Sequence, residues 1–91
     1  MNYTVKWTSR FKKDYKRMLK QGVDIGLLDQ VIRKLSAGES LPPEYRNHPL
    51  IGSYTGFQEC YIKPDWLLIY RYERDVLVLV LPRTGSHDDL F

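Results

Sequence analysis

The segment 57–81 limits the fold most strongly, because it holds three apolar runs with only two short connections between them. The runs are Phe57–Ile62, Leu67–Tyr72 and Val76–Leu81, and they are rich in Val, Ile, Leu and Tyr. Connections this short allow antiparallel hairpins but no crossover. The third run is apolar on both faces, which is typical of a strand covered on both sides. We therefore expect an antiparallel meander whose last strand lies inside the sheet.

The N-terminal third of the chain predicts one strand followed by a helix. Apolar and polar residues alternate over positions 2–7, as in a half-buried strand. Either Thr8 or Ser9 can cap the helix that follows, and Gly22 ends it. Its apolar stripe has the helical period and consists of Phe11, Tyr15, Met18 and Leu19.

A second helix is expected between Asp24, as its cap, and Gly38. Its inward stripe consists of Leu28, Val31, Ile32 and Leu35. The element order is then β-α-α-β-β-β. We expect an α+β fold in which the N-terminal strand and two helices pack on a small antiparallel sheet, with residues 1–91 forming one domain.

Charge is concentrated at the N-terminus of a chain whose formal net charge is only +3. Seven of the 14 basic residues lie in the first twenty positions, where Asp14 is the one acidic residue. A basic face of this kind suits a phosphate backbone or an acidic protein partner, and the simpler alternative is a solvated helix face. The single cysteine, the absence of a long apolar run and an N-terminus without a signal-peptide core favour the cytoplasm.

Both histidines lie in polar segments bounded by Pro and Gly. His48 falls in the irregular stretch 39–56, and His87 falls in the polar tail 82–91. Imidazole titrates near neutral pH, so both are candidates for general acid–base catalysis, although two surface histidines without a role fit the pattern equally well. A metal site has little support, because no paired-histidine spacing is present.

The first hairpin turn brings a carboxylate and an indole together. Asp65 suits a turn for structural reasons, but Trp66 beside it is unusual, and an exposed ring there could stack on an unpaired base. Tyr70 and Arg83 complete the set of candidates. The planar fork of Arg83 could bind a phosphate oxygen and stabilise charge that develops on it.

Three motifs together make the resemblance specific. They are Asn47–Leu50 with Gly52-Ser53, then Gly56–Glu59 followed by Lys63–Tyr70, and finally Arg83–His87 ending in Leu90-Phe91. In this order and spacing the chain resembles the RelE superfamily of toxins from bacterial type II toxin–antitoxin systems, and within it the YafQ-type branch of mRNA interferases. The resemblance covers nearly the whole chain and implies a RelE-like fold.

The resemblance also implies an activity and a set of site residues. It implies a ribosome-dependent, metal-free mRNA endoribonuclease without a cofactor, which cuts RNA by attack of the 2′-OH. The implied catalytic residues are His87, His48, Asp65 and Arg83. Substrate contacts are expected from Trp66, Phe91, Tyr61, Tyr70 and Glu59. Ribosomal RNA contacts are expected from Arg10, Lys12, Lys13, Lys16, Arg17 and Lys20.

Tyr61 is a departure from the branch, which usually has a histidine at this position. Tyrosine has an ordinary pKa near 10 and is a poorer base at neutral pH, so His48, Asp65 and Tyr61 all remain candidates for the general base. The resemblance implies an antitoxin protein, the ribosome and mRNA as partners, with the toxin monomeric on its own and hetero-oligomeric with its antitoxin. The alternative is an inactive nucleic-acid-binding or antitoxin-binding module with the same fold.

Overall fold

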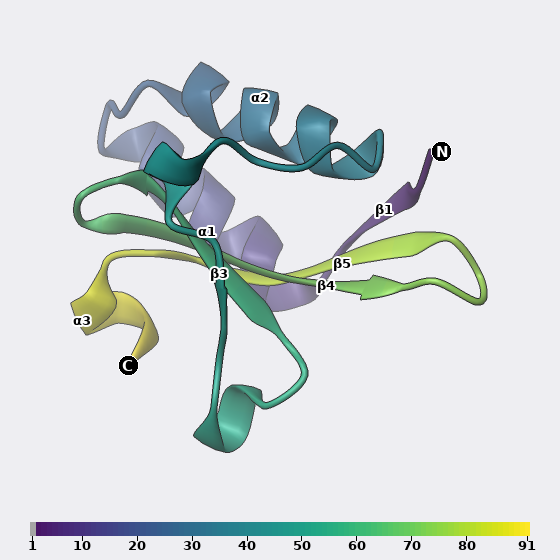
Figure 1. The fold of residues 1–91 in the computed structure, drawn as a ribbon. Coiled ribbons are helices and arrows are strands. Elements are labelled where there is room, and N and C mark those ends of the chain that lie inside the picture. The colour runs from purple at the N-terminus through teal and green to yellow at the C-terminus, as the bar shows by residue number, and fades with distance from the viewer. Residues whose placement is uncertain (1) are drawn as a thin grey trace.

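The computed structural model describes residues 2–91 and shows an α+β fold built on one five-stranded sheet (Figure 1). The two long helices lie on one side of the sheet, and a short C-terminal helix packs on the other side. The elements are β1 (Thr4–Trp7), α1 (Ser9–Lys20), α2 (Ile25–Ser36), η1 (Pro43–Tyr45), β2 (His48–Pro49), η2 (Gly52–Tyr54), β3 (Gln58–Lys63), β4 (Trp66–Glu73), β5 (Val78–Gly85) and α3 (His87–Leu90).

The sheet has the order β1-β5-β4-β3-β2. The antiparallel meander β3-β4-β5 is confirmed, and β5 lies between β1 and β4, as its two apolar faces predicted. The N-terminal strand β1 joins this antiparallel meander by pairing with β5 in parallel, so the complete sheet is mixed. A parallel pair needs a long crossover connection, and the chain from β1 to β5 provides one through both helices and three strands.

Strand β5 begins later and ends later than the apolar run suggested. Val76 and Leu77 belong to the turn, where Leu77 has a φ of +52°. The strand then continues through Pro82 to Gly85, in a stretch expected to be an irregular tail. Pro82 lies in a bulge, where β5 has one residue more than β4 after the Ile69–Arg83 pair. A bulge leaves a backbone position out of the ladder, so the missing N–H of proline costs little there.

Helix α1 begins where the sequence predicted. The hydroxyl of Thr8 accepts a hydrogen bond from the Phe11 amide at 3.1 Å, so Thr8 is the cap. Asp24 precedes α2, but its side chain makes no capping hydrogen bond. The predicted apolar stripes are buried or half-buried except for Leu19, which is 49% exposed. Asp14 is buried in α1 instead.

Besides the two 3₁₀ turns η1 and η2, a short strand and a short helix were not expected. His48 and Pro49 form an edge strand that pairs with β3, because the irregular stretch 39–56 returns beside it. After β5 the chain forms α3, where Ser86 and Asp89 make a capping box and Leu90 is buried. Both elements hold a histidine, so both histidines are fixed by backbone structure.

Alternation along β4 separates the two faces of the sheet. Trp66, Leu68 and Tyr70 face α1 and α2 in the main core. Leu67 and Ile69 face the other way and form a smaller cluster with Leu90 of α3. Within residues 2–91, every helix is too short or too polar to span a lipid bilayer.

Candidate active site

The two histidines flank one tyrosine on the face of the sheet that α1 and α2 leave uncovered. His48 lies in β2, Tyr61 in β3, and His87 is the first residue of α3. The ring centroids of His48 and Tyr61 are 6.2 Å apart, and those of Tyr61 and His87 are 5.8 Å apart. Folding therefore brings both imidazoles to the same tyrosine, although they come from segments about forty residues apart in the chain.

His87 is oriented by Asp65. One oxygen of the Asp65 carboxylate accepts the backbone N–H of His87 at 3.2 Å and lies 3.1 Å from its Nδ1. These hydrogen bonds, the backbone one first, hold the pKa of Asp65 below its ordinary value. The carboxylate is thus ionised at neutral pH, and Nδ1 carries the proton that it accepts. The Nε2 atom points the other way, 3.3 Å from the hydroxyl of Tyr61.

His48 is held by a carbonyl on one side and a carboxylate on the other. Its Nδ1 lies 2.7 Å from the carbonyl oxygen of Arg46, which can only accept, so Nδ1 carries a proton. Its Nε2 lies 3.2 Å from Oε1 of Glu59. Glu59 is 3% exposed, and its Oε2 has no hydrogen-bond partner. Glu59 was expected to contact the substrate, but in the structure it is buried beneath His48.

Arg83 is not free to clamp a phosphate as expected. Its Nε and Nη2 atoms lie 2.7 and 3.1 Å from the two carboxylate oxygens of Asp14, and the pair is almost fully buried. Hydrogen bonding to Asp14 raises the pKa of Arg83 above its ordinary value. The ion pair joins α1 to β5, and this explains why an acidic residue lies within the basic N-terminal segment.

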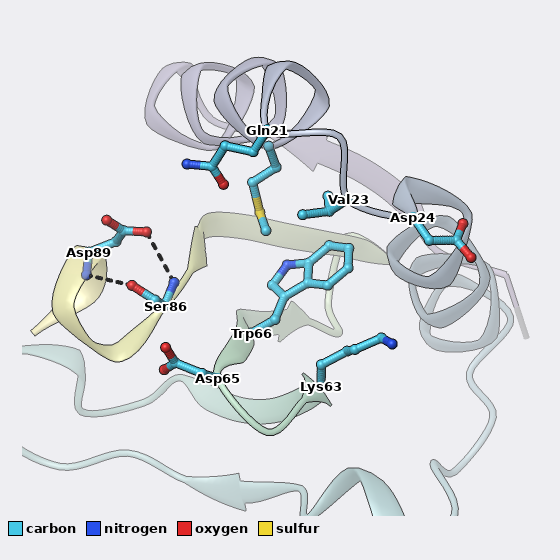
Figure 2. Close-up of a pocket in the computed structure, with 9 residues that line it drawn as sticks. Gln21, Val23, Asp24, Lys63, Asp65, Trp66, Ser86 and Asp89 are labelled. Carbon is cyan, nitrogen blue, oxygen red and sulfur yellow. Dashed lines mark hydrogen bonds between the residues drawn. The ribbon is translucent and has the colours of Figure 1, made fainter.

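Trp66 is a core residue, so the expectation of an exposed stacking ring is wrong. It is 5% exposed, and its indole N–H donates to the Thr84 hydroxyl at 3.1 Å. Figure 2 shows the indole directed toward the α1–α2 connection, beside Val23. It lines an apolar hollow of about 430 Å³ with Met18 and Val23, on the helix side of the hairpin turn. Strand alternation places Trp66 there, whatever the exposure of Asp65 before it.

Tyr70 is also buried away from the histidines. It is 2% exposed, and its hydroxyl donates to Asn47 at 2.7 Å on the helix side of the sheet. Its predicted substrate contact is therefore wrong, because residues two apart on a strand share a face and Tyr70 shares that of Trp66. Cys60 lies in the same core, and burial raises the pKa of its thiol to about 12, which excludes it as a nucleophile at neutral pH.

Phe91 lies beside the histidine site in an exposed position. It is 63% exposed, with its ring centroid 5.8 Å from that of Tyr54 and 6.4 Å from that of His87. Together with Arg10 and Arg83 it lines an open hollow between α1 and α3. A base could stack on this ring, so its predicted substrate contact is compatible with the geometry and stays a prediction.

The basic residues of α1 divide into two groups. The Arg17 guanidinium forms ion pairs with Asp14 at 3.0 Å and with Asp89 at 3.3 Å. Because these carboxylates already neutralise its charge, the structure does not favour the predicted contact of Arg17 with RNA. The remaining basic residues of the predicted surface are exposed, and they are Arg10, Lys12, Lys13, Lys16 and Lys20.

Comparison with known proteins places the whole chain in one family. The family model described as the bacterial toxin of type II toxin–antitoxin system, YafQ, matches residues 3–91. This chain belongs to the YafQ family. The mRNA interferase toxin YafQ of Escherichia coli is 33% identical over 88 residues, which cover 96% of this chain and 94% of that protein.

Solved YafQ structures and related toxins share the fold. A metal-bound toxin from Helicobacter pylori is 41% identical, with a TM-score of 0.91 and full coverage of both chains. The E. coli YafQ chain in the complex with the antitoxin DinJ is 32% identical, with a TM-score of 0.90 and coverage of 100% of this chain and 99% of that chain. The chain is thus a YafQ-type toxin of a type II toxin–antitoxin system.

Sequence reasoning missed three residues that shape this YafQ site. Asp14 could have been found, because a lone acid among seven bases suggests an ion pair within the fold. Arg46 directly precedes the Asn-His-Pro motif, but nothing in the sequence says that its carbonyl holds His48. Thr84 lies within the C-terminal motif, and its bond to Trp66 depends on the unexpected length of β5.

Proposed function

We propose that this toxin is a ribosome-dependent mRNA endoribonuclease that cuts RNA by attack of the 2′-OH on the adjacent phosphate. The observation that carries the proposal is the pair of imidazoles on either side of Tyr61, each held by its own carboxylate. Such cleavage needs one group to take the 2′-OH proton and another to protonate the leaving oxygen. The name of the E. coli relative, mRNA interferase toxin, supports RNA as the substrate.

His87 is the general acid in this proposal. Asp65 fixes the ring with Nδ1–H toward its carboxylate, so the proton to be transferred is carried by Nε2. The negative charge of Asp65 stabilises the protonated ring before it gives up that proton. Asp65 therefore acts through His87, and not as the general base.

His48 is the general base. With Nδ1–H bound to the Arg46 carbonyl, Nε2 is the atom of His48 that can take the 2′-OH proton, and it does so when the 2′-OH replaces the 3.2 Å contact with Oε1 of Glu59, because two bare acceptors would repel there. After this atom takes the 2′-OH proton, the neighbouring Glu59 carboxylate stabilises the charged ring. Tyr61 lies between the two rings, and its hydroxyl donates to the phosphate oxygen that approaches His87.

The reaction proposed here does not pass through a metal ion. The H. pylori relative is described as metal-bound, so the donor set of this chain needs a direct comparison with what a metal requires. Over residues 2–91, no three His, Cys, Asp or Glu side chains converge closely enough to hold an ion. The position between the two histidines is occupied by the phenol of Tyr61, which is a weaker metal ligand than an imidazole. The side chains of this site therefore do not fit a metal ion.

The partners follow from the same proposal. The E. coli relative was crystallised with DinJ, and we infer that an antitoxin protein binds this chain and forms a hetero-oligomer with it. The free toxin is monomeric and acts in the cytoplasm. On the ribosome the exposed basic residues of α1 contact ribosomal RNA.

The test is single-turnover cleavage of mRNA on translating ribosomes, with the ends of the products identified. The parent should leave 2′,3′-cyclic phosphate ends, should be unaffected by EDTA, and should fail on a message with a 2′-deoxy nucleotide at the cut. His87→Ala should lower the rate by about 10²–10⁴, the usual effect of losing a general acid, while Asp88→Ala should retain it.

Two outcomes contradict the proposal. Unchanged cleavage by a folded His87→Ala protein removes the assignment of the acid. Binding to ribosomes without any cut by the parent favours the alternative, an inactive binding module of the same fold.

A further inference from the structure

A small hollow lies beside Tyr61 and is lined by residues of the 43–46 turn and the first hairpin turn. It has a volume of about 250 Å³ and is open to solvent. Two cationic side chains, Arg46 and Lys63, line it together with one acid, Glu44. The remaining lining residues are Tyr61, Ile62 and Pro64. Tyr61 therefore belongs to two neighbouring sites, because it lines this hollow and also contacts His87.

Arg46 has an unusual backbone conformation. Its φ of +51° and ψ of +43° are left-handed, which is uncommon for a residue with a side chain. In this conformation its carbonyl reaches Nδ1 of His48, while its guanidinium carbon lies 5.3 Å from the centroid of the Tyr61 ring. One residue thus orients the proposed base and places a cation beside it. Strained backbone of this kind is common at functional sites.

The guanidinium of Arg46 makes no ion pair within residues 2–91, although Glu44 lines the same hollow. Three other arginines differ in this respect. Arg17 and Arg83 pair with Asp14, and Arg71 pairs with Glu73. Arg46 is exposed, so its donors are available to an anion from outside the molecule.

We propose that Arg46 and Lys63 bind the RNA phosphate next to the one that is cleaved. The scissile phosphate belongs near Nε2 of His87 and the Tyr61 hydroxyl, which lie 3.3 Å apart. The guanidinium lies over the face of the Tyr61 ring, whereas the hydroxyl at the ring's edge contacts His87, so we assign the guanidinium to a neighbouring phosphodiester and not to the reacting one. This subsite rests on the proposed function and adds to it a determinant of where the RNA strand lies.

The test compares two uncleavable RNA oligonucleotides by NMR titration. The probes are fully 2′-O-methylated diadenylate, with one phosphate, and triadenylate, with two. The parent should bind the longer one about tenfold more tightly, because a charge-assisted hydrogen bond contributes on that scale. Arg46→Gln should lose most of this gain, and Arg46→Lys should keep part of it. Arg33→Gln, which removes an exposed arginine from α2, is the matched control.

A side-chain variant of Arg46 leaves the backbone carbonyl that holds His48 in place, so the two roles of the residue are separable. On ribosomes, Arg46→Gln and Lys63→Gln should raise the half-saturating toxin concentration with little change in the maximal rate. A shallower salt dependence should accompany this rise.

Each outcome is decisive for one of the two proposals. An equal gain for triadenylate in Arg46→Gln and Arg33→Gln overturns the subsite, as does a parent that binds neither oligonucleotide. A parent that binds triadenylate through Arg46 but never cuts mRNA keeps the subsite and overturns the proposed function. If the parent cuts mRNA but its tighter binding of triadenylate does not depend on Arg46, the proposed function stands and the subsite is overturned.

Discussion

At the scale of single residues, the Asp14–Arg83 pair has the largest expected effect on stability. The Asp14 side chain is 4% exposed and that of Arg83 is 12% exposed, with a shortest contact of 2.7 Å. Removing one partner leaves the other charge buried and uncompensated, which costs about 3–5 kcal/mol. We expect Asp14→Ala to lower the free energy of unfolding by about 3 kcal/mol, measured by urea denaturation.

Asp24→Ala provides the comparison for this measurement. Asp24 is an exposed acid that precedes α2 without a side-chain capping bond, so its loss should change stability by about 0.5 kcal/mol or less. Equal effects of the two substitutions would mean that the buried ion pair does not join α1 to β5 energetically.

The sequence predicted the histidines and Asp65 of the site better than it predicted which face of the sheet the aromatic side chains occupy. His48, His87 and Asp65 meet as the motifs suggested, because each lies next to a backbone turn or cap that fixes it. Trp66 and Tyr70 do not, since the face of a strand residue depends on register, and β4 is apolar on both sides. No local pattern distinguishes its two faces, so the buried ring of Trp66 could not be inferred.

At the scale of elements, α3 should depend on the ionisation of one carboxylate. The four-residue helix is held by the capping box of Ser86 and Asp89. The backbone N–H of Ser86 lowers the pKa of Asp89 below its ordinary value of 3.8. A group whose pKa is lower in the folded state stabilises it at neutral pH, and this contribution is lost as the pH falls through the lowered pKa. We therefore expect α3 to loosen in acid before the sheet unfolds.

The measurement is the ¹⁵N heteronuclear NOE of Leu90 and Phe91, whose amides donate to Ser86 and His87 within this turn. Below about pH 4 both values should fall in the parent. Asp89→Ala should show the low values at every pH, whereas Asp88→Ala should behave like the parent, because Asp88 takes no part in the cap. An ordered α3 in Asp89→Ala would show that packing of Leu90 alone holds the helix.

Long periodic elements were predictable, and short ones were not. The sequence patterns of α1, α2, β3 and β4 are easy to recognise, because each element buries one or two faces over many residues. The two-residue β2 has no period of its own and exists only by pairing with β3. The end of β5 was not predicted, because a proline followed by polar residues is typical of an irregular segment. Here a bulge accommodates Pro82 and lets the strand continue.

At the scale of the whole molecule, the basic face begins beside the histidine site and extends away from it along α1. Arg10 of α1 lines the same open hollow as Phe91, which neighbours His87. The exposed lysines continue from there along α1, on the helix side of the sheet. A strand of RNA held at the site would therefore leave a second, separate surface for phosphates of the ribosome.

This arrangement predicts that substitutions on α1 change ribosome binding without changing the rate of RNA cleavage. Lys12→Glu with Lys16→Glu should weaken ribosome association and make it less dependent on salt, because fewer counterions are released when fewer phosphates are contacted. The maximal cleavage rate at saturating toxin should stay near that of the parent, since neither lysine touches the histidine site. Co-sedimentation with ribosomes over a salt series, combined with single-turnover cleavage, measures both. Arg33→Glu with Lys34→Glu applies the same charge change on α2 and should leave both unchanged. Identical salt dependence for the parent and the α1 variant would show that this basic face only keeps the helix solvated.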